Sequence, residues 1–116
     1  MTFYSQVSAT AFANIKSGRR LIEPRLNDDA HKQIRPGDLL VMTNRDKPDQ
    51  KLVAKVVGIL RYPSFIEMFH INDSERFGAD DPAELLAEMH HYYPTAQEIK
   101  NGVLGLKLHL LKSAKL

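Results

Sequence analysis

The stretch Lys16-Ser17-Gly18-Arg19-Arg20-Leu21-Ile22-Glu23-Pro24-Arg25-Leu26 decides how this sequence folds. Its first part predicts the end of a helix, because glycine adopts the left-handed backbone that commonly terminates helices. The remainder alternates polar and apolar residues, which is typical of a strand. Three arginines in so short a segment offer forked donors that suit phosphate or carboxylate groups. The segment therefore predicts a helix–strand corner with a candidate site for an anion.

Strand alternation predicts which side chains of this segment lie together. It places Arg19, Leu21, Glu23 and Arg25 on one face, so Glu23 is expected to bridge arginines on either side. Arg20 is expected at the corner, facing the mouth of the fold. Two interpretations follow from the residues: an internal ion-pair network that supports the strand, or a pocket in which Glu23 orients arginines around an anionic or nucleobase ligand.

The motif G-x-[KR]-x-x-E-x-R, followed about a dozen residues later by G-D, resembles the ASCH family of the PUA-like superfamily, a group of small RNA-associated β-barrels. The motif falls on Gly18, Arg20, Glu23, Arg25, Gly37 and Asp38. Three later segments resemble landmarks of a bacterial subgroup: Arg61–Phe65, Pro82–Tyr93 and Gly102–Leu106. The resemblance implies an α+β fold, a PUA-like mixed β-barrel of five or six strands with helices covering one opening.

The resemblance also implies a small intracellular protein that binds RNA or a nucleoside- or nucleotide-like ligand in a basic cleft. The residues expected to line the cleft are Lys16, Arg19, Arg20, Glu23, Arg25, Arg61, Tyr62 and Ser64. The last three follow a predicted strand and open a predicted helix, whose free N–H groups favour an anion. Tyr62 offers a ring for base stacking. The alternative is that Tyr62 and Phe65 close the barrel end while Ser64 only caps the helix.

Two other classes of function stay open. Some ASCH proteins are amidohydrolases that act on acetylated cytidine, with a lysine and a threonine where this sequence has Arg20 and Glu23. An arginine in a protein does not lose its proton, and the hydroxyl nucleophile is missing. Ribonuclease activity is also associated with the family, so a hydrolase of a modified nucleoside or of RNA remains an alternative. A protein-interaction module is the third, and it predicts an exposed apolar stripe on Pro82–Tyr93.

Composition sets outer limits on these functions. The 116 residues suit one domain, and the absence of cysteine excludes disulfides, thiol nucleophiles and thiolate zinc sites. No histidine pair has metal-ligand spacing, so neither a metal site nor a cofactor is predicted. The first residues lack a basic segment followed by an apolar one, and no apolar run has membrane-spanning length. We therefore expect a cytoplasmic protein without membrane contact; the oligomeric state is not indicated.

Charge is distributed unevenly along the chain. Residues 1–61 carry 11 basic and 6 acidic groups, residues 62–99 carry 1 and 8, and residues 100–116 carry 4 and none. The basic ends attract a polyanion, while the acidic middle weakens that field at long range. An ordinary balanced surface explains the same pattern.

Periodicity and capping residues predict the order of elements within a single domain over 1–116. Strands are expected at 2–7, 20–26, 38–43, 51–60 and 103–112, with a helix at 10–17 capped by Thr10. An acidic helical insertion is expected at about 63–101, with helices capped by Ser64, Asp81 and Thr95. Strand 51–60 is apolar on both faces and should be covered on both. Leu104, Leu106, Leu108 and Leu110 should face the interior.

Overall fold

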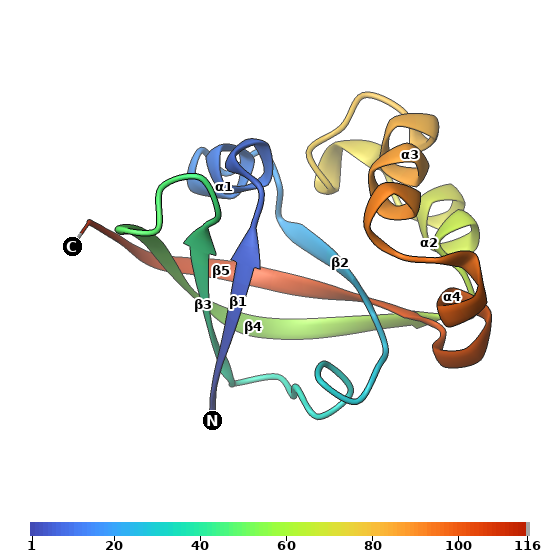
Figure 1. Ribbon diagram of the computed structural model, residues 1–116, viewed down its shortest axis with the longest axis horizontal. Coiled ribbons are helices and arrows are strands. Elements are labelled where there is room, and N and C mark those ends of the chain that lie inside the picture. Colours follow the sequence, from blue (N-terminus) through green and yellow to red (C-terminus); the bar gives the residue numbers. More distant parts are fainter. Residues whose placement is uncertain (116) are drawn as a thin grey trace.

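The computed structural model describes residues 1–115, and the side chains of residues 1–111. One five-stranded mixed sheet curls into a half-barrel (Figure 1). Its strands are β1 (Thr2–Val7), β2 (Ile22–Leu26), β3 (Leu39–Asn44), β4 (Gln50–Tyr62) and β5 (Val103–Lys115). Their order is β1-β3-β4-β5-β2, with β1 and β3 parallel and the other neighbours antiparallel. The sheet stays open because β1 and β2, its two edges, do not pair within the described residues.

Helices occupy two positions around the sheet. Helix α1 (Ala9–Lys16) follows β1, and the other helices lie between β4 and β5 in the sequence. These are α2 (Phe65–Ile71), the short 3₁₀ helix η1 (Ser74–Arg76), α3 (Pro82–Tyr92) and α4 (Thr95–Asn101). Figure 1 shows α2, α3 and α4 grouped at one end of the half-barrel, away from α1. The predicted α+β fold, a barrel-like mixed sheet of five or six strands with helices over one opening, is therefore confirmed with five strands, although the sheet is an open half-barrel. No helix in the described part of the chain has the length and apolarity to span a membrane.

Two of the four residues that were predicted to cap helices do so in the structure. Ser64 Oγ accepts from the Glu67 backbone N–H at 3.3 Å, and Asp81 Oδ1 accepts from the Glu84 N–H at 3.0 Å. The prediction for α1 was wrong, because Ser8 rather than Thr10 is its cap. Thr95 is the first residue of α4 and not its cap.

Glu98 explains why the capping box expected at Thr95 is not made. Its carboxylate is buried and accepts from the Phe65 N–H at 2.9 Å, and it lies 3.1 Å from His90 Nε2. A capping-box glutamate would instead turn back toward the start of its own helix. Glu98 thus links α4 to the start of α2 and to His90 of α3.

Two apolar cores pack the sheet against its helices, one beneath α1 and one beneath α2 and α3. The α1 core contains Phe12 and Ile15 of α1 with the inward residues of β3, β4 and β5, among them Leu104 and Leu106. Leu108 and Leu110 pack against the same core, which confirms the predicted inward face of the last strand. The α2–α3 core lies on the other side of the sheet.

The α2–α3 core brings three aromatic side chains, two from α2 and one that follows η1, against the edge strand β2. It contains Phe65, Phe69 and Phe77 together with Ile22 and Leu26. Gly105 lets α2 approach the sheet closely: a Cβ at this position would lie 2.9 Å from Ile22 Cγ2 and 3.1 Å from Met68 Sδ. The helices and β2 therefore form one packed unit.

A bulge in β4 changes which of the two apolar cores its later side chains contact. The register with β5 shifts between Val56 and Gly58, so Ile59 lies opposite Leu106 and joins the α1 core, while Leu60 joins the α2–α3 core. Regular alternation would have kept Leu60 on the face of Leu52, Ala54 and Val56 and Ile59 on the other face, and the bulge reverses this. Coverage of both faces is also incomplete, since Val57 remains 54% exposed.

Candidate functional site at the open edge of the half-barrel

Arg20 lies buried at the corner between α1 and β2, where it holds two acidic side chains. Its Nε donates to the Phe77 carbonyl at 2.7 Å, and its Nη2 donates to Glu88 Oε1 at 2.7 Å. Its Nη1 lies 3.5 Å from both oxygens of Glu23. Burial alone would lower the pKa of Arg20, but the carboxylates of Glu23 and Glu88 outweigh it and raise that pKa. Arg20 therefore stays charged and fixes both carboxylates.

Glu23 bridges Arg20 to a second arginine on the same strand. Glu23 and Arg25 lie opposite Leu106 and Leu104 of β5, so both side chains lie on the face of those leucines. Arg25 Nε is 3.6 Å from Glu23 Oε1. Burial would lower the pKa of Arg25, but the Glu23 carboxylate and, after it, the Tyr93 hydroxyl outweigh burial and raise that pKa. The bridge expected at Glu23 exists, but its partners are Arg20 and Arg25 rather than Arg19.

Arg25 carries a hydrogen-bond donor with nothing to bond to. Its Nη2 is buried and has no hydrogen-bond partner. A buried donor without a partner costs roughly 1–3 kcal/mol, more when the group is charged. Such groups are rare in proteins and mark positions that a water, ion or ligand completes.

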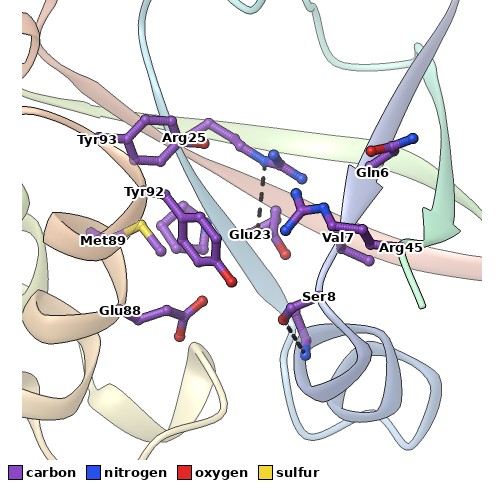
Figure 2. A pocket seen from close by; sticks show the side chains of 12 residues that line it. Gln6, Val7, Ser8, Glu23, Arg25, Arg45, Glu88, Met89, Tyr92 and Tyr93 are labelled. Atoms are coloured by element: carbon purple, nitrogen blue, oxygen red, sulfur yellow. Dashed lines mark hydrogen bonds and ion pairs between the residues drawn. The ribbon is translucent and has the colours of Figure 1, made fainter.

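Glu23, Arg25 and Glu88 line a pocket of about 250 Å³ in the open seam between the two edge strands, and the buried Arg20 supports its wall (Figure 2). One wall is the end of β1 and the start of α1, with Gln6, Val7 and Ser8. Glu23, Pro24 and Arg25 of β2 line the pocket beside them. The opposite wall is the second half of α3 and the residue after it, with Glu88, Met89, Tyr92 and Tyr93. The pocket thus lies where the sheet fails to close and the helices approach.

The edge of β2 at this pocket has a specific backbone chemistry. Leu21 accepts from the Leu108 N–H and Asn27 donates to the Gly102 carbonyl, so the odd-numbered residues between them bond to β5. Pro24 therefore turns its nitrogen toward the seam, where its lack of an N–H breaks no bond of the ladder. The same proline leaves the edge a poor template for another strand.

Arg45 brings a further cation to the pocket from the loop between β3 and β4. Its backbone N–H donates to the Val7 carbonyl at 2.9 Å, which fixes the loop beside the end of β1. Its guanidinium lies 5.6 Å from the centre of the Tyr92 ring. Figure 2 shows Arg25 and Arg45 directing their guanidinium groups into the same space. Among the lining residues, Glu23 and Glu88 balance Arg25 and Arg45, and the buried Arg20 that contacts both glutamates brings the charge of the whole cluster to +1.

The remaining residues of the predicted site do not reach this pocket. Lys16 is exposed at the end of α1. Arg19 pairs with Asp80 at 3.2 Å on the surface, because it precedes β2 and does not share the face of Glu23. The expected grouping of Arg19 with Glu23 and Arg25 was therefore wrong.

The residues after β4 are separated from the pocket as well. Tyr62 packs against the α2–α3 core, and its hydroxyl accepts from Asn72 Nδ2 at 3.3 Å. Ser64 caps α2. Arg61 lines a different cleft, with Asn27, Arg35 and Asp38. The predicted site is thus divided: Arg20, Glu23 and Arg25 come together, and the others lie elsewhere.

Several pocket residues were missed by sequence reasoning. Arg45 stands in a polar stretch outside the motif, and Tyr92 and Tyr93 end the predicted helix Pro82–Tyr93, where an aromatic pair is typical of core packing. The structure places Tyr93 partly in the core, 5.9 Å from Phe65, while Tyr92 is 42% exposed at the pocket. Glu88 had no local signal, since its role depends on Arg20, 68 positions earlier.

The similarity of this chain to known proteins lies in its three-dimensional structure. The sequence matches no protein-family model, and it matches none of the curated proteins with which it was compared. Two solved structures of similar size align over nearly their whole lengths. The hypothetical protein PH0355 is 28% identical, with a TM-score of 0.84 over 96% of this chain and 100% of that one. Protein PF0455 from Pyrococcus furiosus is 26% identical, with a TM-score of 0.76 over 97% and 99%.

Two more distant structures carry a family name. ASCH from Zymomonas mobilis is 8% identical, with a TM-score of 0.67 over 99% of this chain and 73% of that one. The ASCH domain from Lactobacillus crispatus JV V101 is 14% identical, with a TM-score of 0.56 over 93% and 79%. At such identities the likeness concerns the fold. The curled mixed sheet, its helices between β4 and β5 and these alignments agree, and the chain has the ASCH-domain fold.

Proposed function

We propose that the pocket at the open seam binds a nucleotide-like ligand, as a free nucleotide or as one nucleotide of a single-stranded RNA. The observation that carries the proposal is the buried, unpartnered Nη2 of Arg25. A phosphate oxygen or a base carbonyl is an acceptor that would complete it. Because Arg20 already neutralises much of Glu23 and Glu88, the charge left over at Arg25 and Arg45 favours an anion.

Size and ring chemistry support a single nucleotide. The volume of about 250 Å³ lies just below the ~300–1,000 Å³ of typical small-molecule sites, which suits a compact ligand. Tyr92 is partly exposed there and presents a ring against which a base can stack. In RNA, stacking of this kind requires an unpaired base, so the proposal concerns single strands.

Hydrolysis of an acetylated nucleoside has weaker support from the same pocket. The residues that line it include no lysine or threonine. Ser8 is the nearest counterpart of a hydroxyl nucleophile, and its Oγ accepts the Ala11 N–H at 3.1 Å as a helix cap. Arg20 lies 3.5 Å from both oxygens of Glu23 and donates to Glu88 Oε1 at 2.7 Å, so both carboxylates are engaged by a guanidinium, which favours a role in binding. The proposal is therefore for a binding site.

The interaction-module alternative has no support from α3. Leu85 and Met89 are buried in the α2–α3 core, and Leu86 packs against it. Tyr92 is the large apolar side chain of α3 that reaches solvent, and it belongs to the pocket. An exposed apolar stripe along Pro82–Tyr93, which this alternative requires, is not seen in the described residues.

A thermal-shift screen tests the proposal. The ligands are nucleosides, nucleoside monophosphates, short single-stranded RNAs and inorganic phosphate. A ligand present at about 100 times its Kd stabilises the folded state by ~2.7 kcal/mol, a shift of several degrees in Tm. Nucleoside monophosphates should stabilise more than the matching nucleosides, because only they bring a phosphate to the arginines. The proposal fails if no nucleotide or RNA raises the Tm above the effect of inorganic phosphate.

A further inference from the structure

We propose a second, separate binding site for a phosphate group in the cleft formed by Asn27, Arg35 and Arg61. This cleft has a volume of about 650 Å³ and lies between the end of β2, the loop that follows it and the end of β4. It shares no lining residue with the seam pocket. The inference is therefore independent of the nucleotide pocket.

The walls of the cleft are held rigidly by backbone bonds. The Asn27 N–H donates to the Gly102 carbonyl at 3.0 Å, which fixes the end of β2. Arg61 lies in β4 opposite Leu104 of β5. The loop between them is anchored by Ile34, which is buried in the α1 core. A ligand in this cleft would meet groups that are already positioned, which lowers the entropic cost of binding.

The Gly37-Asp38 pair builds the turn that presents Arg35. Gly37 has a φ of +98°, a conformation that suits glycine, and its N–H donates to the Val56 carbonyl at 2.7 Å. Asp38 Oδ2 accepts the Arg35 backbone N–H at 2.8 Å, while the Asp38 N–H donates to the Arg35 carbonyl at 3.0 Å. The part of the sequence motif that lies outside the seam pocket thus shapes this second cleft.

Two of the cations that line the cleft, Arg35 and Arg61, have no acidic partner among the described residues. The Asp38 carboxylate is already engaged by the Arg35 N–H and the amino group of Met1, at 2.8 and 3.0 Å. Within the described residues, neither the Arg35 guanidinium nor that of Arg61 has a carboxylate within ion-pair distance. Lys32 also lines the cleft and pairs only with the exposed Asp29. Two free guanidinium groups facing one cleft attract a phosphate, which accepts forked donors.

Asn27 supplies the second, independent sign of a ligand. Its Oδ1 is buried without a hydrogen-bond partner, although its backbone is firmly bonded. The amide Nδ2 can donate to a phosphate oxygen, whereas Oδ1 accepts only, so a bound water or the hydroxyl of a phosphate monoester would complete it. A polar side chain left unsatisfied beside two unpaired arginines is the pattern of a site that its ligand completes.

An NMR titration with inorganic phosphate tests this site. Saturable shifts are expected at the backbone amides of Asn27, Gly37 and Asp38. Arg35→Gln and Arg61→Gln should each weaken phosphate binding at least about tenfold, because each removes a charge-assisted hydrogen bond. Both side chains are exposed, so the variants should fold normally. Lys47→Gln is the matched control, since Lys47 is exposed and lines neither cleft.

The same variants distinguish the source of the phosphate. If it belongs to an RNA backbone, Arg61→Gln should weaken binding of a short RNA, while nucleoside monophosphate binding in the seam pocket stays unchanged. If it is a free phosphate, Arg61→Gln should weaken phosphate binding and leave RNA binding unchanged; both results support the site. The proposal is overturned if phosphate produces no saturable shift at this cleft, or if Lys47→Gln weakens binding as much as Arg61→Gln.

Discussion

Arg20 Nη2 lies 2.7 Å from Glu88 Oε1, which ties the corner between α1 and β2 to the middle of α3. The same guanidinium reaches Glu23 in β2 and the Phe77 carbonyl beyond η1. One side chain thus links the edge strand to the helices that cover it. This position makes Arg20 a support of the seam pocket, while Arg25 and Arg45 face its interior.

Replacing Arg20 with alanine should lower the free energy of unfolding by about 3–5 kcal/mol, because it leaves Glu23 buried with a single distant partner. Arg19→Ala is the matched control and should cost less than about 1 kcal/mol, since Arg19 and Asp80 form an exposed pair. Urea denaturation of both variants measures the difference. Equal losses would mean that Arg20 is not the link described above.

Leu106→Ala should cost about 2–5 kcal/mol, because Leu106 is fully buried where β2, β4 and β5 meet. Leu111 on the same strand is 50% exposed, so Leu111→Ala should change stability by less than about 0.5 kcal/mol. Denaturant titration compares the two variants with the parent protein. A loss below about 1 kcal/mol for Leu106→Ala would contradict the register of β5.

Asp38 should make the protein sensitive to acid. Its pKa lies below the ordinary value, mainly because its carboxylate accepts the Arg35 backbone N–H, with a further contribution from the amino group of Met1. A depressed pKa in the folded state stabilises the protein above the unfolded-state pKa, and this stability is lost as pH falls through the folded-state pKa. Stability measured across acidic pH should therefore fall less steeply for Asp38→Asn than for the parent. Parallel curves would show that the turn does not depend on this carboxylate.

The fold could be predicted largely because its signals are local. Alternating leucines identified β5, and Ser64 and Asp81 identified the starts of two helices. The errors came from features that local patterns do not encode. The bulge at Val57 reversed the faces of Ile59 and Leu60, and Glu98 bonds to Phe65 of α2 rather than capping its own helix.

The site was predictable only in part, for a related reason. Arg20, Glu23 and Arg25 are close in sequence, and one motif identifies all three as candidate site residues. Arg45 and Tyr92 reach the same pocket from a loop and a helix that are distant in sequence, and only the curl of the sheet places them there. Arg61 was predicted to lie with Arg20, Glu23 and Arg25 because it ends a strand just before a helix, whereas the structure places the end of β4 at another cleft.

The affinity of Arg45→Gln for a nucleoside monophosphate tests the central claim most directly. Arg45 is exposed and its side chain has no acidic partner in the described part of the chain, so the variant should keep the stability of the parent. Isothermal titration should show binding at least about tenfold weaker than in the parent, because a charge-assisted hydrogen bond to the phosphate is lost. Lys47→Gln, in the same loop, should bind like the parent. Equal affinity of Arg45→Gln and Lys47→Gln would contradict the assignment of the seam pocket as a nucleotide site.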